Sequence, residues 1–236
     1  MSVEDKQFLK IMSDSAQIKD GHYQLELPFK QKNIMMPNNR KLAEQRAESL
    51  KSKFKRNKVF HDEYKTFLEA VIAKGHAQLL PQEQLKPESG KVWYIPHHGV
   101  HHPKKGKIRV VFDCSASYQG YSLNDKLIQG PNLTNTLLGV LIRFRQEQIA
   151  FMADVEGMYH QVKVAPADQD YLRFLWWPGG DVSLPLAEYR TTVHLFGATS
   201  SASCATYALT KTPEDNKDDF SAEAVDTVGR NVYVDD

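Results

Sequence analysis

Three carboxylates occupy positions from which they could hold a metal ion. Asp154 follows the apolar residues 149–153, and Asp235 and Asp236 follow the apolar residues 232–234. We interpret both runs as strands, and an unpaired carboxylate at a buried strand end is costly unless a positive charge compensates it. Mg²⁺ prefers oxygen ligands, so two strands delivering carboxylates to one point would form a two-metal site. Taken alone, Asp154 is better explained as a turn or cap residue.

A dense histidine cluster offers a second kind of chemistry. It consists of His97, His98, His101 and His102, near the tip of a predicted hairpin. Imidazoles are common zinc ligands. No cysteine pairs accompany these histidines, so phosphate contact or plain solvent exposure is the favoured interpretation.

The hydropathy pattern predicts helices and strands in no regular alternation. Helices are predicted over residues 40–57, 62–75, 134–148 and 200–211, and strands over 25–29, 91–96, 107–113, 149–153, 171–177, 187–196 and 231–236. The rest of residues 1–38 and the acidic residues 213–219 are expected to be irregular. In the third helix, Leu137, Leu138, Leu141 and Phe144 are expected to face inward. This mixture predicts an α+β fold.

Composition excludes several classes of protein. The chain has 236 residues, 41% of them hydrophobic and 25% charged, which excludes wholesale disorder and a coiled-coil rod. It has no apolar run long enough to span a membrane and no signal-peptide pattern at its start. Cys114 and Cys204 are too few for a disulfide framework, so we expect an intracellular location and structural roles for both thiols.

Charge is unevenly distributed along the chain. Residues 1–110 carry 21 Lys and Arg against 12 Asp and Glu, a balance of +9, whereas residues 111–236 carry 9 against 17, a balance of −8. A basic half next to an acidic half is compatible with a polyanion partner. Solvated helix faces explain the basic half equally well, and for Lys51, Lys53 and Lys55 that explanation is slightly favoured.

Four segments in order resemble one enzyme family. They are KGKIRVVFDCSA (105–116), FMADVEGMYHQVKV (151–164), HLFGATSSASCATYAL (194–209) and YVDD (233–236). Together they resemble the reverse transcriptases of BEL/Pao-class long-terminal-repeat retrotransposons, and residues 37–50 and 63–80 resemble the lead-in of such elements. YVDD alone is a weak signal, but four motifs in this order are a strong one.

The resemblance implies a particular organisation. It implies reverse-transcriptase-like fingers and a partial palm, with an antiparallel sheet flanked by helices. A mostly helical lead-in (1–90) would precede the fingers (91–148) and the palm (149–236). The thumb, RNase H and integrase regions would lie outside the chain, so we expect the chain alone to be a weak or inactive polymerase.

The resemblance also assigns roles to single residues. Asp154, Asp235 and Asp236 would be catalytic and, with the carbonyl of Val155, would hold two Mg²⁺ ions, with Mn²⁺ as an alternative. Nucleotide contacts are assigned to Lys104, Lys105, Arg109, Val155, Tyr159, Phe196 and Gly197, and a primer contact to Tyr233. Many family members have glutamine where this chain has Phe196.

The implied function is RNA-directed DNA polymerisation, with transfer of nucleotides to a primer 3′-hydroxyl. Partners would be an RNA or DNA template with its primer, deoxynucleoside triphosphates, and the thumb, RNase H, integrase and aspartic protease regions of a polyprotein, with no membrane. The location would be cytoplasmic, in a virus-like particle for the parent polyprotein, or nuclear. The alternative is a non-catalytic nucleic-acid-binding remnant, and a metal-dependent hydrolase of small molecules ranks far below both.

Overall fold

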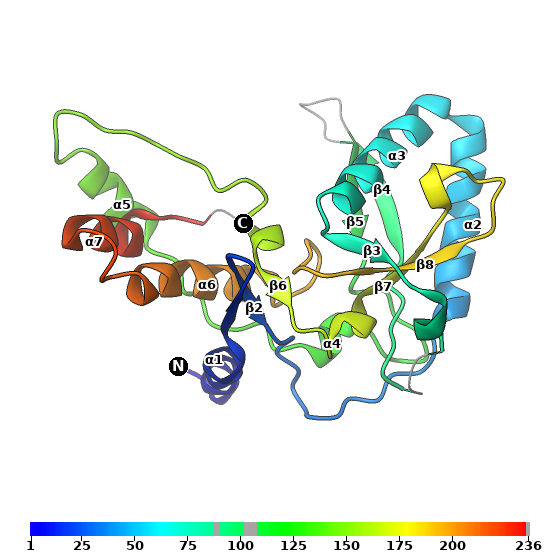
Figure 1. Ribbon diagram of the computed structural model, residues 1–236, viewed down its shortest axis with the longest axis horizontal. Helices are drawn as coiled ribbons and strands as arrows, with labels where there is room; N and C mark the ends of the chain where they lie inside the picture. Colours follow the sequence, from blue (N-terminus) through cyan, green and yellow to red (C-terminus); the bar gives the residue numbers. More distant parts are fainter. Residues whose placement is uncertain (87–89, 102–107, 235–236) are drawn as a thin grey trace.

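Helices and short strands follow one another irregularly in the fold, which is α+β. The computed structural model describes residues 1–86, 90–101 and 108–234 (Figure 1). The helices are α1 (Val3–Ser15), α2 (Arg40–Arg56), α3 (Lys58–Ala73), α4 (Leu123–Lys126), α5 (Leu137–Phe144), α6 (Ser201–Asp215) and α7 (Ala222–Asn231). The strands are β1 (Gln17–Lys19), β2 (His22–Leu25), β3 (Ala77–Leu79), β4 (His97–His101), β5 (Ile108–Phe112), β6 (Lys163–Val164), β7 (Arg173–Trp176) and β8 (Ala187–Thr191). The 3₁₀ turns are η1 (Gln82–Gln84), η2 (Met158–Gln161), η3 (Gln169–Leu172) and η4 (Pro178–Gly180).

The strands form three small sheets. One has the order β3-β8-β7 and is antiparallel throughout, and the pair β4-β5 is an antiparallel hairpin. The third has the order β1-β2-β6, in which β2 and β6 are parallel. Short strands cannot bury much surface by themselves, so each sheet depends on the helices packed against it.

The larger core lies between α2, α3, the hairpin and the sheet β3-β8-β7, on the right of Figure 1. Phe54 of α2 and Tyr64 of α3 face this core, and their rings lie 5.2 Å apart. Trp93, Trp176 and Trp177 are at most 1% exposed within it. Burial of this much aromatic surface stabilises the packing of the two helices on the sheet.

A smaller core joins α1, β2 and α6. Helix α1 begins with a capping box in which the Ser2 hydroxyl accepts a bond from the Asp5 amide and the Asp5 carboxylate accepts one from the Ser2 amide. Phe8 and Met12, four residues apart on one helix face, are fully buried. This helix was not predicted, because its two core residues give too weak a periodic pattern by themselves.

One buried ion network crosses the larger core. The guanidinium of Arg173, 0% exposed, donates to the carboxylate of Glu188 at 3.0 Å and also pairs with Asp170. The Tyr94 hydroxyl and the Arg40 guanidinium bond to the same Glu188 carboxylate. Each charge therefore has partners, which a buried charge requires.

Several predicted elements are confirmed and several change their bounds. Helices α2 and α6 and strands β5, β7 and β8 lie where the pattern predicts them. Helix α3 begins before residue 62, because Asn57 caps it by accepting a bond from the Phe60 amide. The partner of β5 is β4 and not residues 91–96, whose backbone meets residues 170–173 instead. Helix α6 extends to Asp215, into the acidic residues 213–219 expected to be irregular, and α7 forms where no helix was predicted.

The prediction of strands over residues 149–153 and 231–234, which were expected to carry the carboxylates, is wrong. Residues 149–155 have no regular structure and residues 232–234 have none either, with residue 231 closing α7. Ile149, Phe151 and Met152 are each more than 80% exposed. A strand needs a neighbour that accepts and donates backbone hydrogen bonds, and no described strand pairs with either segment.

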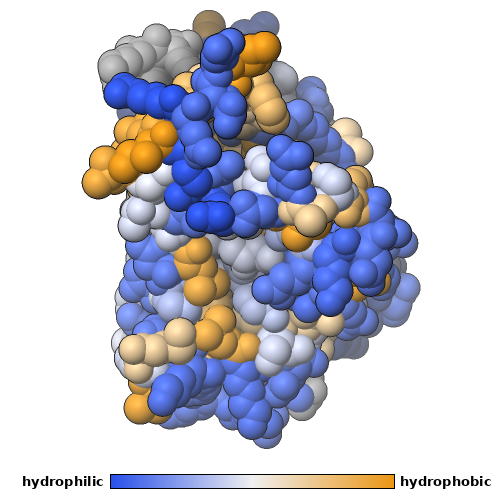
Figure 2. Space-filling model, turned by 90° about the vertical axis from the view of Figure 1, so that its left-hand side faces the viewer, coloured by the Kyte–Doolittle hydropathy of each residue, from blue (hydrophilic) through white to orange (hydrophobic). Residues whose placement is uncertain are grey.

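The prediction that the apolar residues of the helix over 134–148 face inward is also wrong. Helix α5 is shorter than predicted, and its apolar residues Leu137, Leu138, Leu141 and Phe144 are 41–70% exposed. It packs on α7 through polar contacts, such as the Arg143 guanidinium with Asn231. Figure 2 views this end of the molecule and shows apolar patches between hydrophilic ones.

Candidate functional site

The end of strand β5 meets the segment after Leu195 at a very close backbone contact. Gly197 has φ of +113°, and a Cβ atom there would lie 2.2 Å from the carbonyl oxygen of Phe112. The Asn124 amide clamps the contact, donating to the Gly197 carbonyl at 3.0 Å and accepting from the Thr199 amide at 2.9 Å. Only glycine fits both the backbone conformation and the space.

Two aromatic side chains lie together beside this glycine. The ring centroids of Tyr159, in η2, and Phe196 are 4.3 Å apart, with the ring planes tilted by 39°. His160 meets the same Phe196 ring edge-on at 5.9 Å. Phe196 is 54% exposed and Tyr159 is half-buried, so the pair forms a partly open aromatic surface.

A pair of histidines packs against this aromatic surface. The rings of His160 and His76 lie 4.8 Å apart, and both line a narrow hollow with the apolar side chains of Phe67, Val71 and Leu195. Burial, together with the neighbouring His76 and Lys74, lowers the pKa of His160 to about 4. Burial, then Lys74 and His22, also lower the pKa of His76. At neutral pH both rings are therefore uncharged and can stay in contact.

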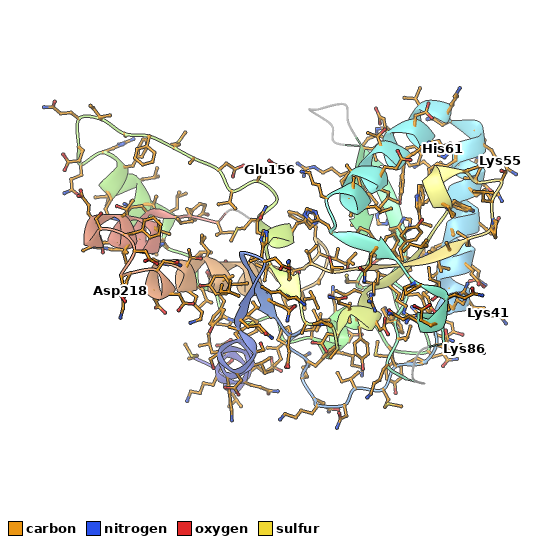
Figure 3. All side chains as sticks on the ribbon, in the orientation of Figure 1. Lys41, Lys55, His61, Lys86, Glu156 and Asp218 are labelled. Atoms are coloured by element: carbon orange, nitrogen blue, oxygen red, sulfur yellow. The ribbon has the colours of Figure 1, made fainter. Side chains whose placement is uncertain are left out.

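The turn before Tyr159 is tied to helix α3. Lys74, just after that helix, pairs with Glu156 at 2.8 Å, and this Lys74 contact lowers the pKa of Glu156. Gln161 donates to the Glu156 carbonyl at 2.8 Å, and Gly157 takes a left-handed φ of +58° that closes the turn. Figure 3 shows Glu156 near the middle of the molecule.

Asp154 lies just before this turn and is exposed. Its carboxylate has no hydrogen bond or ion pair with any residue that the structure describes. The adjacent Val155 is 46% exposed. A free carboxylate next to a main-chain carbonyl is an oxygen donor set of the kind that Mg²⁺ accepts, so these two residues fit the predicted metal in their chemistry. Within residues 1–86, 90–101 and 108–234, no three His, Cys, Asp or Glu side chains are grouped to hold an ion.

Of the other residues predicted for the site, two lie in the part of the chain that the structure describes and four lie outside it. Arg109 is exposed on β5, on the strand face opposite Val110 and Phe112. Tyr233 is 40% exposed, and the residue before it is fastened by a 2.8 Å bond from the Asn135 amide to its carbonyl. Lys104, Lys105, Asp235 and Asp236 lie outside the described residues. The structure therefore brings Tyr159, Phe196 and Gly197 together but leaves the meeting of the three carboxylates a prediction.

The described histidines of the cluster differ in their exposure. His97 is buried, with the Tyr64 hydroxyl 2.5 Å from its Nδ1 and the Leu175 carbonyl 3.0 Å from its Nε2. His98 and His101 are exposed, and His102 lies outside the described residues. Both nitrogens of His97 are thus engaged within the protein, which leaves this ring no free position for zinc.

Four supporting residues were not predicted from the sequence. Asn124, His76 and Lys74 each act on the site through a partner distant in sequence, at Gly197, His160 and Glu156 respectively. His160 directly follows Tyr159 and could have been noticed for that reason. No local pattern marks the other three, because their roles arise only when the chain folds.

The sequence matches no model of a known protein family, and it matches no curated protein. In the described part of the chain no helix combines the length and the apolar character needed to cross a membrane.

Proposed function

We propose that the chain is the fingers and partial palm of an RNA-directed DNA polymerase of a BEL/Pao-class retrotransposon. The observation that carries the proposal is the 4.3 Å contact between Tyr159 and Phe196, next to Gly197. The resemblance assigns these residues, from two distant motifs, to one nucleotide pocket. Their meeting supports that assignment, because nothing in the local sequence of either motif requires it.

In the proposed pocket, the side chains would select and hold the incoming nucleotide by their shape and charge. The Tyr159 ring would block the 2′ position of the incoming sugar, and its contact with Phe196 would hold it in place. Gly197 would let the backbone approach the nucleotide, since a side chain there has no room. Arg109, Lys104 and Lys105 would contact the triphosphate, for which the planar guanidinium of arginine is well suited. Tyr233 would lie near the primer end.

Metal ligation would come from Asp154, the Val155 carbonyl, Asp235 and Asp236. When bound, two Mg²⁺ ions would lower the pKa of the primer 3′-hydroxyl and neutralise charge on the triphosphate. Asp154 is suited to this role because its carboxylate is exposed and unpaired among the described residues, whereas Glu156 is engaged by Lys74.

Primer extension tests the proposal. The assay uses poly(rA) with an oligo(dT) primer and Mg²⁺, on the chain and on any longer version encoded by the same reading frame. We expect dTTP incorporation in the active version to disappear with Asp154→Asn. Glu156→Gln is the matched control, since it removes a neighbouring carboxylate and should keep activity. Equal loss in both variants would contradict the metal role of Asp154.

A non-catalytic nucleic-acid-binding remnant is the second candidate. It is favoured by the lack of strand structure at residues 149–155 and 232–234, the two segments expected to deliver the carboxylates. This function predicts salt-sensitive binding of RNA or DNA and no incorporation by any version of the chain.

A further inference from the structure

A basic corner forms where helix α2 ends and helix α3 begins. Between Glu48 and Asp62 the chain has five cations and no anion. The five residues of the basic corner are Lys51, Lys53, Lys55, Arg56 and Lys58. All are exposed except the half-buried Lys51, and none forms an ion pair with a described carboxylate. By contrast, Arg40 at the other end of α2 pairs with both Glu44 and Glu188.

The corner is held on a rigid support. Phe54 is 3% exposed and stacks on His61, with ring centroids 4.5 Å apart. Asn57, between the helices, caps α3 through a 3.0 Å bond from the Phe60 amide. Lys53 lies over the Phe60 ring, with its Nζ 3.9 Å from the ring centre. A partner would therefore meet cations whose backbone is already ordered, which lowers the cost of binding.

Helix stability explains only part of this charge. Cations in the last turn of α2 interact favourably with the negative end of its dipole. Lys58, however, is the first residue of α3, where the dipole is positive, and the first turn of α3 contains no acidic residue. Positive charge at a positive helix end is unfavourable in the free protein, and an anion bound there would relieve it.

The corner continues toward the β4-β5 hairpin. The ring of His101 on β4 lies 5.9 Å from the Phe60 ring, and a side chain at Gly99 would collide with Phe60 at 2.8 Å. Figure 3 shows Lys55 at the far right of the molecule, at the opposite end from Asp218 and away from Glu156. The basic corner is therefore a surface separate from the proposed nucleotide pocket.

We propose that the basic corner binds the phosphate backbone of a nucleic acid without reading its sequence. Phe54 and Phe60 are buried, and the corner exposes no aromatic ring on which a base could stack. Its one exposed large apolar side chain is Val59, so it lacks the apolar face with which amphipathic helices enter lipid. Cations without ion-pair partners among the described carboxylates, beside little exposed apolar surface and no exposed aromatic ring, fit a chain of phosphates. The proposal does not depend on catalysis at Asp154.

Fluorescence anisotropy with a labelled RNA of about 20 nucleotides tests this, read over a range of salt concentrations. The test variant replaces Lys51, Lys55, Arg56 and Lys58 with glutamine, leaving Lys53 because it packs on Phe60. The matched control replaces the exposed Lys6, Lys10, Lys30 and Lys32 with glutamine. Both variants lose the same charge, so only its location differs.

We expect the corner variant to bind RNA at least about tenfold more weakly at low salt, with a salt slope shallower by about 3. The control should bind nearly as the unmodified chain does, and Asp154→Asn should bind normally even if it abolishes incorporation. Equal weakening in both charge variants, or no RNA binding by the unmodified chain, would overturn the proposal. The proposal would also be overturned if the chain bound vesicles of anionic phospholipid more tightly than RNA and lost that binding in the corner variant. That result would favour a membrane surface as the partner.

Discussion

The backbone at Gly197 leaves no room for a side chain, and this single residue sets how β5 meets the aromatic pair. Its φ of +113° is rare for residues with a Cβ atom, and the Phe112 carbonyl would lie 2.2 Å from that atom. Backbone atoms cannot rotate away as a flexible side chain can. A substitution must therefore move the segment after Leu195 away from β5.

Gly197→Ala is expected to lower the free energy of unfolding by about 2–4 kcal/mol, from combined strain and displacement. Urea denaturation measures the loss. Gly229→Ala is the matched control, because Gly229 lies within α7 with no atom near its would-be Cβ. That change should be neutral or stabilise by about 0.5–1 kcal/mol. A loss at Gly197 no larger than about 0.5 kcal/mol would show that the contact yields easily.

At the scale of elements, α5 and residues 149–155 form an apolar arm that the rest of the described chain does not cover. Phe151 is 82% exposed and Leu138 70%. Apolar side chains in water contribute little to folding and favour association between molecules. In Figure 1 the main chain runs from α5 at the left of the picture toward the middle of the molecule.

Phe151→Ser and Leu138→Gln are expected to raise solubility while changing the free energy of unfolding by less than about 0.5 kcal/mol. Dynamic light scattering and thermal unfolding check the two effects. Leu68→Gln, at a fully buried position of α3, serves as the contrast and should destabilise strongly. A drop of the melting temperature at Phe151 comparable to that at Leu68 would mean that the arm is packed in solution.

At the scale of the whole molecule, three histidines couple folding to pH. Burial lowers the pKa of His97 and of His194 to about 4, and burial with His76 and Lys74 lowers that of His160 to about 4. The ordinary histidine value is 6.5, so between these values the unfolded chain binds more protons than the folded one. Each histidine therefore contributes stability that is present above about pH 6.5 and is lost as pH falls toward 4.

The carboxyl of Asp168 changes the pH dependence of stability in the opposite direction. Burial raises the pKa of Asp168 to about 6, although its bond from the Leu27 amide lowers it. This group contributes stability below its unfolded value of 3.8, and that contribution is lost as pH rises through 6. Three histidines outweigh one carboxyl, so the net effect between neutral pH and about pH 5 is a loss of stability on acidification.

We expect urea midpoints to fall steadily from about pH 7 to about pH 5. His160→Gln should reduce that pH dependence by up to about 1.4 kcal/mol per pH unit, since it removes one titrating group. Val59→Gln, at an exposed position that carries no titrating group, should leave it unchanged. A urea midpoint that does not change between about pH 7 and about pH 5 would contradict the burial of these histidine rings.

The sequence determined the elements whose signals are local. Helix α2 is marked by a thin apolar stripe of Leu42, Leu50 and Phe54, and β7 by the aromatic and apolar residues of 171–177. The resemblance to reverse transcriptases, which rests on short motifs, singled out Tyr159, Phe196 and Gly197. The α+β class follows from the irregular order of helices and strands, and it is confirmed.

Only the tertiary structure decided which segments found partners. Residues 149–153 and helix α5 have the apolar composition of core segments, yet their apolar side chains are exposed. Burial needs a second apolar surface, and α5 meets α7 through polar contacts instead. The contact of Tyr159 with Phe196 and the clamp of Asn124 on Gly197 join residues far apart in sequence. Spacing along a chain constrains the neighbours within one helix or strand, whereas contacts between distant segments arise from packing the whole chain at once.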